Sequence, residues 1–477
     1  MIGRQFERTR LKKLFDSTEA EFMVVYGRRR VGKTFLIQSY FTEEQDCVFM
    51  QATGLQKGSL KQQLQLFTDA LAKTFFRGAM ITPPKDWGSA FKLLTQQLEM
   101  TTQTVVIFLD EFPWMVTPRA GLLEMLDHYW NQYWSRLKHI RLVICGSSAS
   151  WLIKKIIENK GGLHNRVTSQ LHLKPFTLSE TAAFLKHRKI KLNASHCLSL
   201  YLALGGVPYY LKYVEPGLTA EQNIQRILFD QDAPLHHEFE KLFYSLFKHA
   251  DAYIELIKVI GMRKEGLDRV SLQKHTKISN GGRLSERLKD LVLTGFIQTY
   301  SQLGKTQNIY YKLIDEFSLF YFQWVMPHRN QLFVGEHWLS QHQKPAYASW
   351  AGYAFEAVCM QHIDQVVKAL GIHGGGVISS WRYIPKTSKE CGAQIDLLIE
   401  RNDNAITLCE IKYTREPFVI DKNYALILQR KIDLFNEKTK NKKQVFLALI
   451  SAHGVKKNKY SELLIDQVVT LEHLFIG

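Results

Sequence analysis

Residues 27–34 read Gly-Arg-Arg-Arg-Val-Gly-Lys-Thr, and this stretch decides the first fold prediction. It fits the pattern G-x-x-x-x-G-K-[ST] of a phosphate-binding P-loop. The apolar run 22–26 before it predicts a buried parallel strand, and residues 33–40 after it predict the start of a helix. In that context, backbone N–H groups and the helix N-terminus point at phosphates. A glycine-rich turn matching by chance is the alternative, and the complete motif between a strand and a helix argues against it.

The loop therefore predicts ATP as a ligand. Lys33 is expected to contact the β- and γ-phosphates, and the Thr34 hydroxyl is expected to hold Mg²⁺. The predicted nucleotide-binding residues are Gly27, Arg28, Arg29, Arg30, Val31, Gly32, Lys33 and Thr34.

Two acids follow a second apolar run. Residues 104–109 read Thr-Val-Val-Ile-Phe-Leu and predict a buried parallel strand that ends in Asp110 and Glu111. Ligands of open α/β sheets bind at this end of the strands. We expect Asp110 to support Mg²⁺ and Glu111 to orient and deprotonate the attacking water. The alternative is an exposed Asp-Glu turn.

Two further stretches have open interpretations. Residues 141–145 predict another strand, after which Ser147 and Ser148 could sense the γ-phosphate or could cap a helix. Arg166 is a candidate arginine finger, supplied in cis or by a neighbouring subunit of a homo-oligomer. A surface salt bridge is an equal alternative for Arg166.

Composition narrows the class of protein. The 477 residues predict two to four domains, and the hydrophobic fraction of 45% and charged fraction of 22% are typical of soluble globular proteins. The net charge of +17 favours a polyanionic partner, with nucleic acid, DNA foremost, ahead of a membrane surface. The alternative is a merely soluble basic protein.

Six scattered cysteines without a C-x-x-C pair suggest neither a zinc site nor a disulfide framework, and fit a cytoplasmic protein. No signal peptide and no apolar stretch long enough to span a bilayer are found, so we expect no membrane partner.

The middle of the chain predicts helices and a small hairpin. Residues 178–229 have a helical pattern and are expected to form a lid on the nucleotide sheet. Three helices are then expected, the third over 280–294, before a hairpin that ends near residue 313. This order is that of a winged helix-turn-helix, whose third helix would present Arg283, Arg287 and Lys289 to DNA. A solvated charged face, in a domain that only connects others, is equally open.

The C-terminal part predicts a second cluster of charged residues. A helix over 350–367 carries Glu356, and a hairpin carries Asp396 on one strand and Glu410 and Lys412 on the other. Residues two apart on a strand share a face, so Asp396, Glu410 and Lys412 can converge. Carboxylates suit Mg²⁺, and Lys412 could place a water or stabilise developing charge. The alternative is a hairpin with one polar face.

Together these motifs resemble the archaeal-type P-loop ATPases, a branch near the AAA and signal-transducing NTPase groups. The resemblance covers nearly the whole chain and implies ATPase activity. It is carried by Gly3-Arg4, the arginine-rich loop 27–34, Leu109-Asp110-Glu111-Phe112, Gly146-Ser147, Asn165-Arg166 before Pro175-Phe176, Gly205-Gly206-Val207-Pro208-Tyr209-Tyr210, and Tyr311-Lys312-Leu313-Ile314-Asp315 followed by Phe317 and Phe320-Tyr321.

The tail resembles the PD-(D/E)xK nuclease-like domain. The resemblance makes Asp396 the D, Glu410 and Lys412 the E-x-K, and Glu356 the helical acid. The sequence departs from the pattern at Ile395, where the family has proline. The resemblance implies ATPase activity more firmly than nuclease activity.

The sequence thus predicts an α/β protein: a P-loop ATPase core (1–175), a helical lid (176–240), a winged helix (241–335) and a restriction-endonuclease-like α/β domain (345–477). The expected catalytic residues are Glu111, Lys33, Arg166, Asp396, Glu410 and Lys412, and the expected metal ligands are Thr34, Asp110, Glu356, Asp396 and Glu410. ATP and Mg²⁺ are the expected cofactors. Two functions follow: an ATPase acting on nucleic acid through a metal-dependent nuclease-like domain, or an ATP-driven switch or scaffold with a catalytically silent tail.

Overall fold

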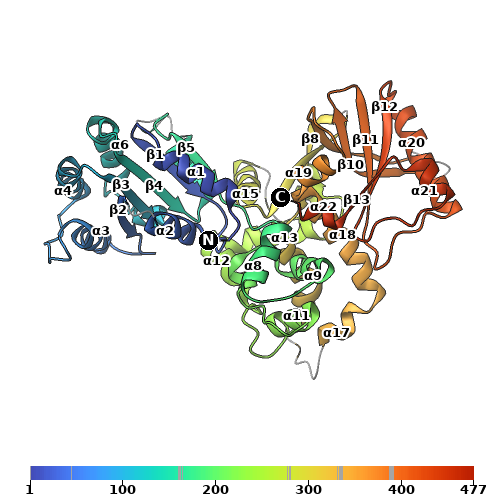
Figure 1. The fold of residues 1–477 in the computed structure, drawn as a ribbon, viewed down its shortest axis with the longest axis horizontal. Helices are drawn as coiled ribbons and strands as arrows, with labels where there is room; N and C mark the ends of the chain where they lie inside the picture. The colour runs from blue at the N-terminus through green and yellow to red at the C-terminus, as the bar shows by residue number, and fades with distance from the viewer. Residues whose placement is uncertain are drawn as a thin grey trace. The chain divides into compact units, whose positions relative to one another are not determined.

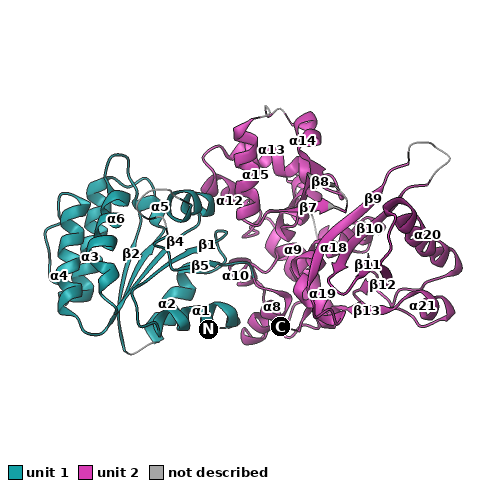
Figure 2. Ribbon diagram, turned by 90° about the horizontal axis from the view of Figure 1, so that it is seen from above, with its two compact units in different colours: residues 1–175 teal, residues 176–477 magenta. Residues whose placement is uncertain are grey.

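The computed structural model describes residues 2–43, 46–158, 163, 165–276, 278, 281–303, 305–329, 331, 337–385 and 391–476. The chain divides into two compact units, residues 1–175 and 176–477 (Figure 2). The boundary coincides with the predicted end of the P-loop domain, whereas the other three predicted domains lie inside unit 2. The predicted limit at residue 335, and Asn280 at the start of the predicted third helix, fall outside the described residues.

Unit 1 is built on a five-stranded sheet in the order β2-β3-β4-β1-β5, and every neighbouring pair is parallel. Strands buried on both faces require continuous apolar runs, which is what the sequence supplies at 22–26 and 104–109. The strands are β1 (Glu21–Tyr26), β2 (Cys47–Thr53), β3 (Thr104–Asp110), β4 (Ile140–Gly146) and β5 (Ser169–His172).

Helices cover both faces of this sheet (Figure 1). Alternate residues of β1 face opposite ways, so Met23 and Val25 pack with α1 and α2, while Phe22 and Val24 pack with α3, α4 and α6. The helical segments of unit 1 are α1 (Gln5–Phe15), α2 (Lys33–Glu43), α3 (Leu60–Phe75), α4 (Trp87–Met100), α5 (Phe112–Met115), α6 (Leu122–Gln132), η1 (Trp134–Arg136), α7 (Ala149–Leu152) and η2 (Ile153–Ile157).

Unit 2 begins with the expected helices and continues through the rest of the chain. A large hydrophobic core extends from Phe176 to Leu474, and a second cluster lies between residues 381 and 447. Its helical segments are α8 (Leu178–His187), α9 (Ala194–Leu204), α10 (Pro208–Leu211), α11 (Ala220–Leu228), α12 (Glu238–Leu246), α13 (Ala250–Gly261), α14 (Arg269–His275), α15 (Gly282–Leu293), α16 (Glu316–Phe320), η3 (Tyr321–Val325), η4 (Met326–His328), α17 (His337–His342), α18 (Pro345–Gln361), α19 (Ile363–Ala369), α20 (Lys422–Thr439), α21 (Lys459–Leu464) and α22 (Leu471–Leu474).

An eight-stranded sheet runs through unit 2 in the order β13-β12-β11-β10-β9-β7-β8-β6. A single parallel backbone pair, Gln302 with Ser380, joins the small β6–β8 ladder to β9. On the C-terminal strands, α20 packs on one face and α18 on the other. The strands are β6 (Leu267–Asp268), β7 (Ile297–Gln302), β8 (Lys305–Leu313), β9 (Gly376–Tyr383), β10 (Ala393–Arg401), β11 (Ala405–Lys412), β12 (Gln444–Ser451) and β13 (Gln467–Thr470).

The helix predicted over 350–367 is interrupted. α18 ends at Gln361 and α19 begins at Ile363, because His362 between them leaves the helical conformation. Among the described helices, none is both long and apolar enough to cross a bilayer.

Candidate nucleotide site and carboxylate cluster

The P-loop of unit 1 depends on two glycines. A Cβ on Gly27 would lie 2.3 Å from the carbonyl oxygen of Leu173, and Gly32 has a φ of +91° that other residues rarely adopt. Directly after Gly32, α2 begins at Lys33. The helix N-terminus therefore opens onto the loop, the arrangement that binds phosphate.

Lys33 lies over the loop that precedes it. Its side chain is buried, and Nζ donates hydrogen bonds to the carbonyl oxygens of Gly27 and Arg28, both at 3.0 Å. Within the loop, Arg28 is also buried, whereas Arg29 and Arg30 are partly exposed. The ammonium group is thus held at the mouth of the loop, where a polyphosphate would give it oxygen partners.

Thr34 in the first turn of α2 is hydrogen-bonded to Asp110 at the end of β3. The Thr34 hydroxyl donates a hydrogen bond of 2.8 Å to Oδ2 of Asp110, a buried carboxylate whose Oδ1 accepts from the Glu111 N–H at 3.0 Å. A hydroxyl and a carboxylate converging beside a phosphate loop are hard oxygen ligands, so these residues fit Mg²⁺. The structure thus brings together two of the residues predicted as metal ligands.

Glu111 has an unusual backbone and a specific partner. It follows β3 in the left-handed region, with φ 45° and ψ 43°. Its Oε2 accepts from the backbone N–H of Ser147 at 3.2 Å and from the Ser147 hydroxyl at 3.1 Å. Ser148, at the N-cap of α7, makes no side-chain capping bond. Ser147 therefore contacts the predicted base, a role that the sequence interpretation did not include.

Arg4 is a functional candidate that sequence reasoning did not assign to the site. Its buried guanidinium donates to the carbonyl oxygens of Val31 at 3.0 Å and Lys174 at 2.7 Å, and pairs with Glu7 at 3.2 Å. It thereby ties the P-loop to the segment after β5. The resemblance to the archaeal-type ATPases includes Gly3-Arg4, which was the available signal, but the role of Arg4 follows only from these distant partners.

Arg166 lies exposed in the turn before β5, where its backbone N–H donates to Leu163 at 3.1 Å. Its side chain makes no hydrogen bond or ion pair with the residues that the structure describes. The finger interpretation therefore stays a prediction, and the surface salt bridge is not seen among these residues.

The C-terminal hairpin brings three of the predicted residues together. β10 and β11 are antiparallel, and the Ile411 N–H donates to Oδ2 of Asp396 at 3.2 Å. The Lys412 ammonium lies 2.8 Å from Oε1 of Glu410, as expected for residues two apart on one strand. The pairing of β10 with β9 shifts register between Ile395 and Leu398, so Asp396 sits in an irregular part of its strand.

Two residues of α20 complete this cluster, and sequence reasoning missed both. The Lys431 ammonium lies 2.7 Å from Oε2 of Glu410, and the Tyr424 hydroxyl donates to Oε1 at 2.7 Å. The two are seven residues apart, so they share one face of the helix. That spacing was the available signal, but it does not reveal which strand the helix covers.

Burial and charge set the protonation of the cluster. Burial, together with the nearby carboxylates of Glu410 and Glu356, raises the pKa of Asp396 to about 7. Burial would also raise the pKa of Glu410, but the ammonium groups of Lys431 and Lys412 outweigh it and lower that pKa. Of Asp396 and Glu410, Asp396 is therefore the carboxyl group whose negative charge is balanced less by nearby ammonium groups.

Glu356 has a lysine partner of its own, since Nζ of Lys312 on β8 lies 2.9 Å from its Oε2. Within the described part of the chain, no group of three or more His, Cys, Asp or Glu residues is arranged to hold a metal ion. The structure thus does not bring Glu356, Asp396 and Glu410 together as three metal ligands. Lysines pair with one oxygen of Glu356 and with both oxygens of Glu410. The buried Glu410 and the partly exposed Asp396 form a carboxylate pair whose oxygens are of the type that Mg²⁺ or Mn²⁺ prefers.

The predicted DNA-contacting residues lie on α15, where they differ in exposure. Arg283 and Lys289 are exposed. Arg287 is partly buried, with its guanidinium 5.9 Å from the ring centroid of Tyr253. The helix therefore offers two exposed cations rather than three.

Comparisons with known proteins give the following matches. Residues 2–214 match the family described as an ATPase domain predominantly from Archaea. The uncharacterized protein MJECL04 of Methanocaldococcus jannaschii is 24% identical over 419 residues, which cover 86% of this chain and 87% of that protein.

Among solved structures, the Walker-type ATPase of Pyrococcus abyssi is 17% identical with a TM-score of 0.49, over 68% of this chain and 96% of that one. The ORC2 protein of Aeropyrum pernix is 15% identical with a TM-score of 0.42, over 67% of this chain and 92% of that one. From the sequence match and the geometry of the loop, residues 2–214 carry an ATPase domain of the archaeal type.

Proposed function

We propose that this protein hydrolyses ATP at the P-loop of unit 1. The observation that carries the proposal is the 2.8 Å hydrogen bond between Thr34 and Asp110 beside Lys33. In this proposal, Lys33 binds the β- and γ-phosphates, and Thr34 and Asp110 hold Mg²⁺, which would neutralise phosphate charge. Glu111 accepts a proton from the attacking water.

A pair of substitutions at Thr34 tests this assignment. Thr34→Ala removes the hydroxyl, so the Mg²⁺ concentration for half-maximal phosphate release should rise, whereas Thr34→Ser keeps the hydroxyl and should behave like the wild type. Lys33→Ala should weaken or abolish turnover. Equal Mg²⁺ dependence of the alanine and serine variants would contradict the role of Thr34, and unchanged turnover in Lys33→Ala would contradict the site.

We further propose that unit 2 acts on nucleic acid, which the net charge of +17 supports. The carboxylate pair Asp396 and Glu410 would hold Mg²⁺ or Mn²⁺. Such an ion would polarise the phosphodiester and lower the pKa of a bound water. Lys412 would place that water or stabilise charge on the phosphate. Lys431, which now neutralises one oxygen of Glu410, would have to yield that oxygen to a cation.

A specific observation favours the second function, a switch or scaffold with a silent tail. Lys312, Lys412 and Lys431 already pair with the carboxylates of Glu356 and Glu410, so much of the cluster's charge is balanced by the chain itself. Such a cluster can be structural. Metal dependence of cleavage therefore decides between the two functions.

The deciding experiment is cleavage of single- and double-stranded DNA and RNA with Mg²⁺ or Mn²⁺, with and without ATP. Asp396→Ala and Glu410→Ala should abolish cleavage and leave ATP turnover unchanged, because the P-loop is in the other unit. Lys412→Ala should reduce cleavage more than metal binding. If the wild type cuts none of these substrates and calorimetry detects no metal, the switch-or-scaffold function replaces the nuclease.

The segment from α13 to β8 supports a winged-helix interpretation, because the helices α13, α14 and α15 precede the β7–β8 hairpin in the expected order. Under this proposal Arg283 and Lys289 contact DNA phosphates. Their joint replacement by alanine should weaken DNA binding and flatten its salt dependence. Unchanged binding would assign the contact to another surface.

A further inference from the structure

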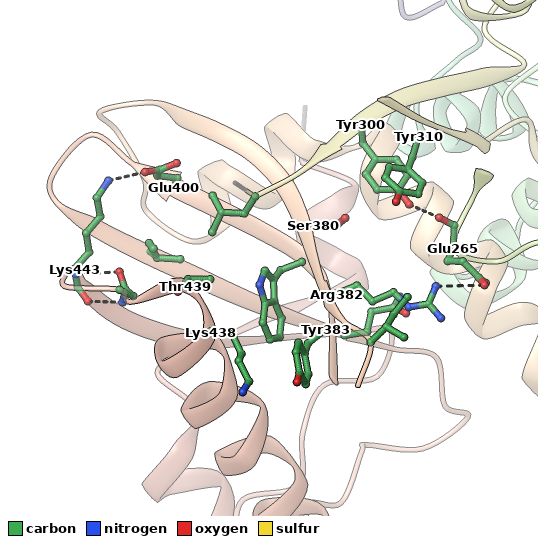
Figure 3. Close-up of a pocket in the computed structure, with 16 residues that line it drawn as sticks. Glu265, Tyr300, Tyr310, Ser380, Arg382, Tyr383, Glu400, Lys438, Thr439 and Lys443 are labelled. Atoms are coloured by element: carbon green, nitrogen blue, oxygen red, sulfur yellow. Dashed lines mark hydrogen bonds and ion pairs between the residues drawn. The ribbon is translucent and has the colours of Figure 1, made fainter. Parts of the chain in front are cut away.

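Unit 2 contains a cavity that neither proposed function uses. It has a volume of about 760 Å³ and lies between the β7–β8 hairpin, the strands β9 and β10, and the C-terminal end of α20 (Figure 3). Four aromatic side chains are among its lining residues, namely Tyr300, Tyr310, Trp381 and Tyr383. A pocket of this size that combines aromatic walls with a few polar groups is typical of ligand sites.

The aromatic walls are fixed before any ligand arrives. Tyr300 and Tyr310 stack across the hairpin with ring centroids 5.5 Å apart and an interplanar angle of 25°. The Tyr300 hydroxyl donates to the backbone carbonyl of Glu265. Trp381 packs edge-on against Phe435, with centroids 5.4 Å apart. Because these rings are held by their neighbours, stacking a planar ligand on them would require little ordering of side chains.

Three cationic side chains, Arg382, Lys438 and Lys443, also line the cavity. The Arg382 guanidinium lies 3.4 Å from Glu265, and the Lys443 ammonium lies 2.7 Å from Glu400. Lys438 lies 4.9 Å from the ring centroid of Tyr383. The side chains of Arg382 and Lys443 are 37% and 33% exposed, and ion pairs at such exposure are weak. A phosphate could therefore compete with the carboxylates for these cations.

The cavity lies along the same elements as the carboxylate cluster. On β10, Glu400 of the cavity is four residues from Asp396, a separation of about 13 Å along a strand. On α20, Lys438 is seven residues from Lys431, about 10 Å along a helix. These separations correspond to a few nucleotides of one nucleic acid strand.

We propose that this cavity binds unpaired bases of a single-stranded nucleic acid, while Arg382, Lys438 and Lys443 hold the adjacent phosphates. The inference rests on the proposed action on nucleic acid and specifies its substrate class. Sequence-tolerant recognition of single strands combines base stacking on aromatic rings with a positively charged rim. A paired base inside a duplex has both faces covered, so it cannot enter.

The first test locates the bases by photo-crosslinking. The full chain, without divalent metal, is irradiated with a single-stranded oligonucleotide containing 5-iodouracil, and labelled residues are identified by mass spectrometry. We expect the label on Tyr300, Tyr310, Trp381 or Tyr383. Binding with the label confined to other segments would overturn the cavity assignment and leave the action on nucleic acid standing.

The second test measures affinity with matched variants. Lys438→Ala with Lys443→Ala should weaken single-strand binding on the order of ten-fold. Tyr383→Ala should weaken it several-fold. The controls are Lys73→Ala with Lys92→Ala, which change the same charge on exposed residues of unit 1, and Tyr244→Ala, which removes a ring that is 60% exposed. Equal losses in the cavity and control variants would overturn the proposal.

Competition distinguishes a strand from a free nucleotide. A mononucleotide such as dTMP should displace the oligonucleotide only at concentrations far above those of an unlabelled single strand. Equal displacement by dTMP, or equal competition by a blunt duplex, would overturn the assignment to single strands. If the full chain binds no nucleic acid of any form, the proposed action of unit 2 on nucleic acid fails together with this inference.

Discussion

Oε2 of Glu111 accepts hydrogen bonds from both the backbone N–H and the hydroxyl of Ser147, at 3.2 and 3.1 Å. Glu111→Gln keeps an oxygen that can accept these bonds, so the left-handed turn after β3 should survive while the base is lost. We expect ATP binding to be retained and phosphate release to fall by on the order of 100-fold. Calorimetric binding and steady-state phosphate release measure the two effects. Normal turnover in the purified variant would exclude Glu111 as the base.

Arg166 is exposed and can be tested as a finger acting between subunits. A Lys33→Ala protein lacks an intact nucleotide pocket, and an Arg166→Ala protein lacks the finger. If the finger acts across a subunit boundary, mixing these two inactive variants should restore part of the ATPase activity. The absence of recovery in oligomers shown to contain both variants would favour action in cis or a structural role.

Lys431 is expected to control how readily the cluster takes a cation. Lys431→Gln removes one of the two ammonium partners described for Glu410, so the folded protein should lose up to about 3 kcal/mol of stability. With one positive charge removed, added Mn²⁺ should raise the melting temperature of the variant more than that of the wild type. Lys422→Gln on the exposed side of α20 is the control. Equal shifts in all three proteins would show that Mn²⁺ does not bind at Glu410.

His362 should make unit 2 sensitive to acid. Burial lowers its pKa to about 4, while its Nε2 accepts from the Leu178 N–H at 2.9 Å and its Nδ1 donates to the Val358 carbonyl at 2.8 Å. The unfolded chain takes up this proton near pH 6.5 and the folded chain only near pH 4. Stability is therefore fully present above pH 6.5 and falls by about 3 kcal/mol as the pH drops to 4.

Urea unfolding of His362→Gln and the wild type at several pH values checks this prediction. The variant should be less stable at neutral pH but should lose less stability between pH 6.5 and 4. His187→Gln, at an exposed position, should follow the wild type. Parallel pH profiles for all three proteins would assign the acid sensitivity to other groups.

The parts of the sites that follow local rules could be predicted from the sequence. The P-loop is a contiguous motif whose glycines meet a backbone requirement, as the φ of +91° at Gly32 shows. The contact between Glu410 and Lys412 follows from the two-residue period of a strand. Such features depend on neighbours in sequence, so no knowledge of tertiary packing was needed.

The remaining contacts depend on how distant elements pack. Arg4 reaches Val31 and Lys174, and Lys431 reaches Glu410 because α20 covers that face of the sheet. No spacing rule relates these positions. For the same reason the pairing of Glu356 with Lys312 could not be predicted, since it joins residues from separately predicted domains.

The Gln302–Ser380 backbone pair has a practical consequence for dividing this chain. A protein shortened after residue 340 would end between two segments that share one core, and β7 would become an uncovered edge strand. Exposed edge strands pair with strands of other molecules, so such a fragment should aggregate rather than fold as a separate domain. Fragments cut between residues 175 and 176 would leave each core whole. Unit 1 can therefore be produced separately from the rest of the chain, whereas unit 2 has to be expressed as one intact fragment.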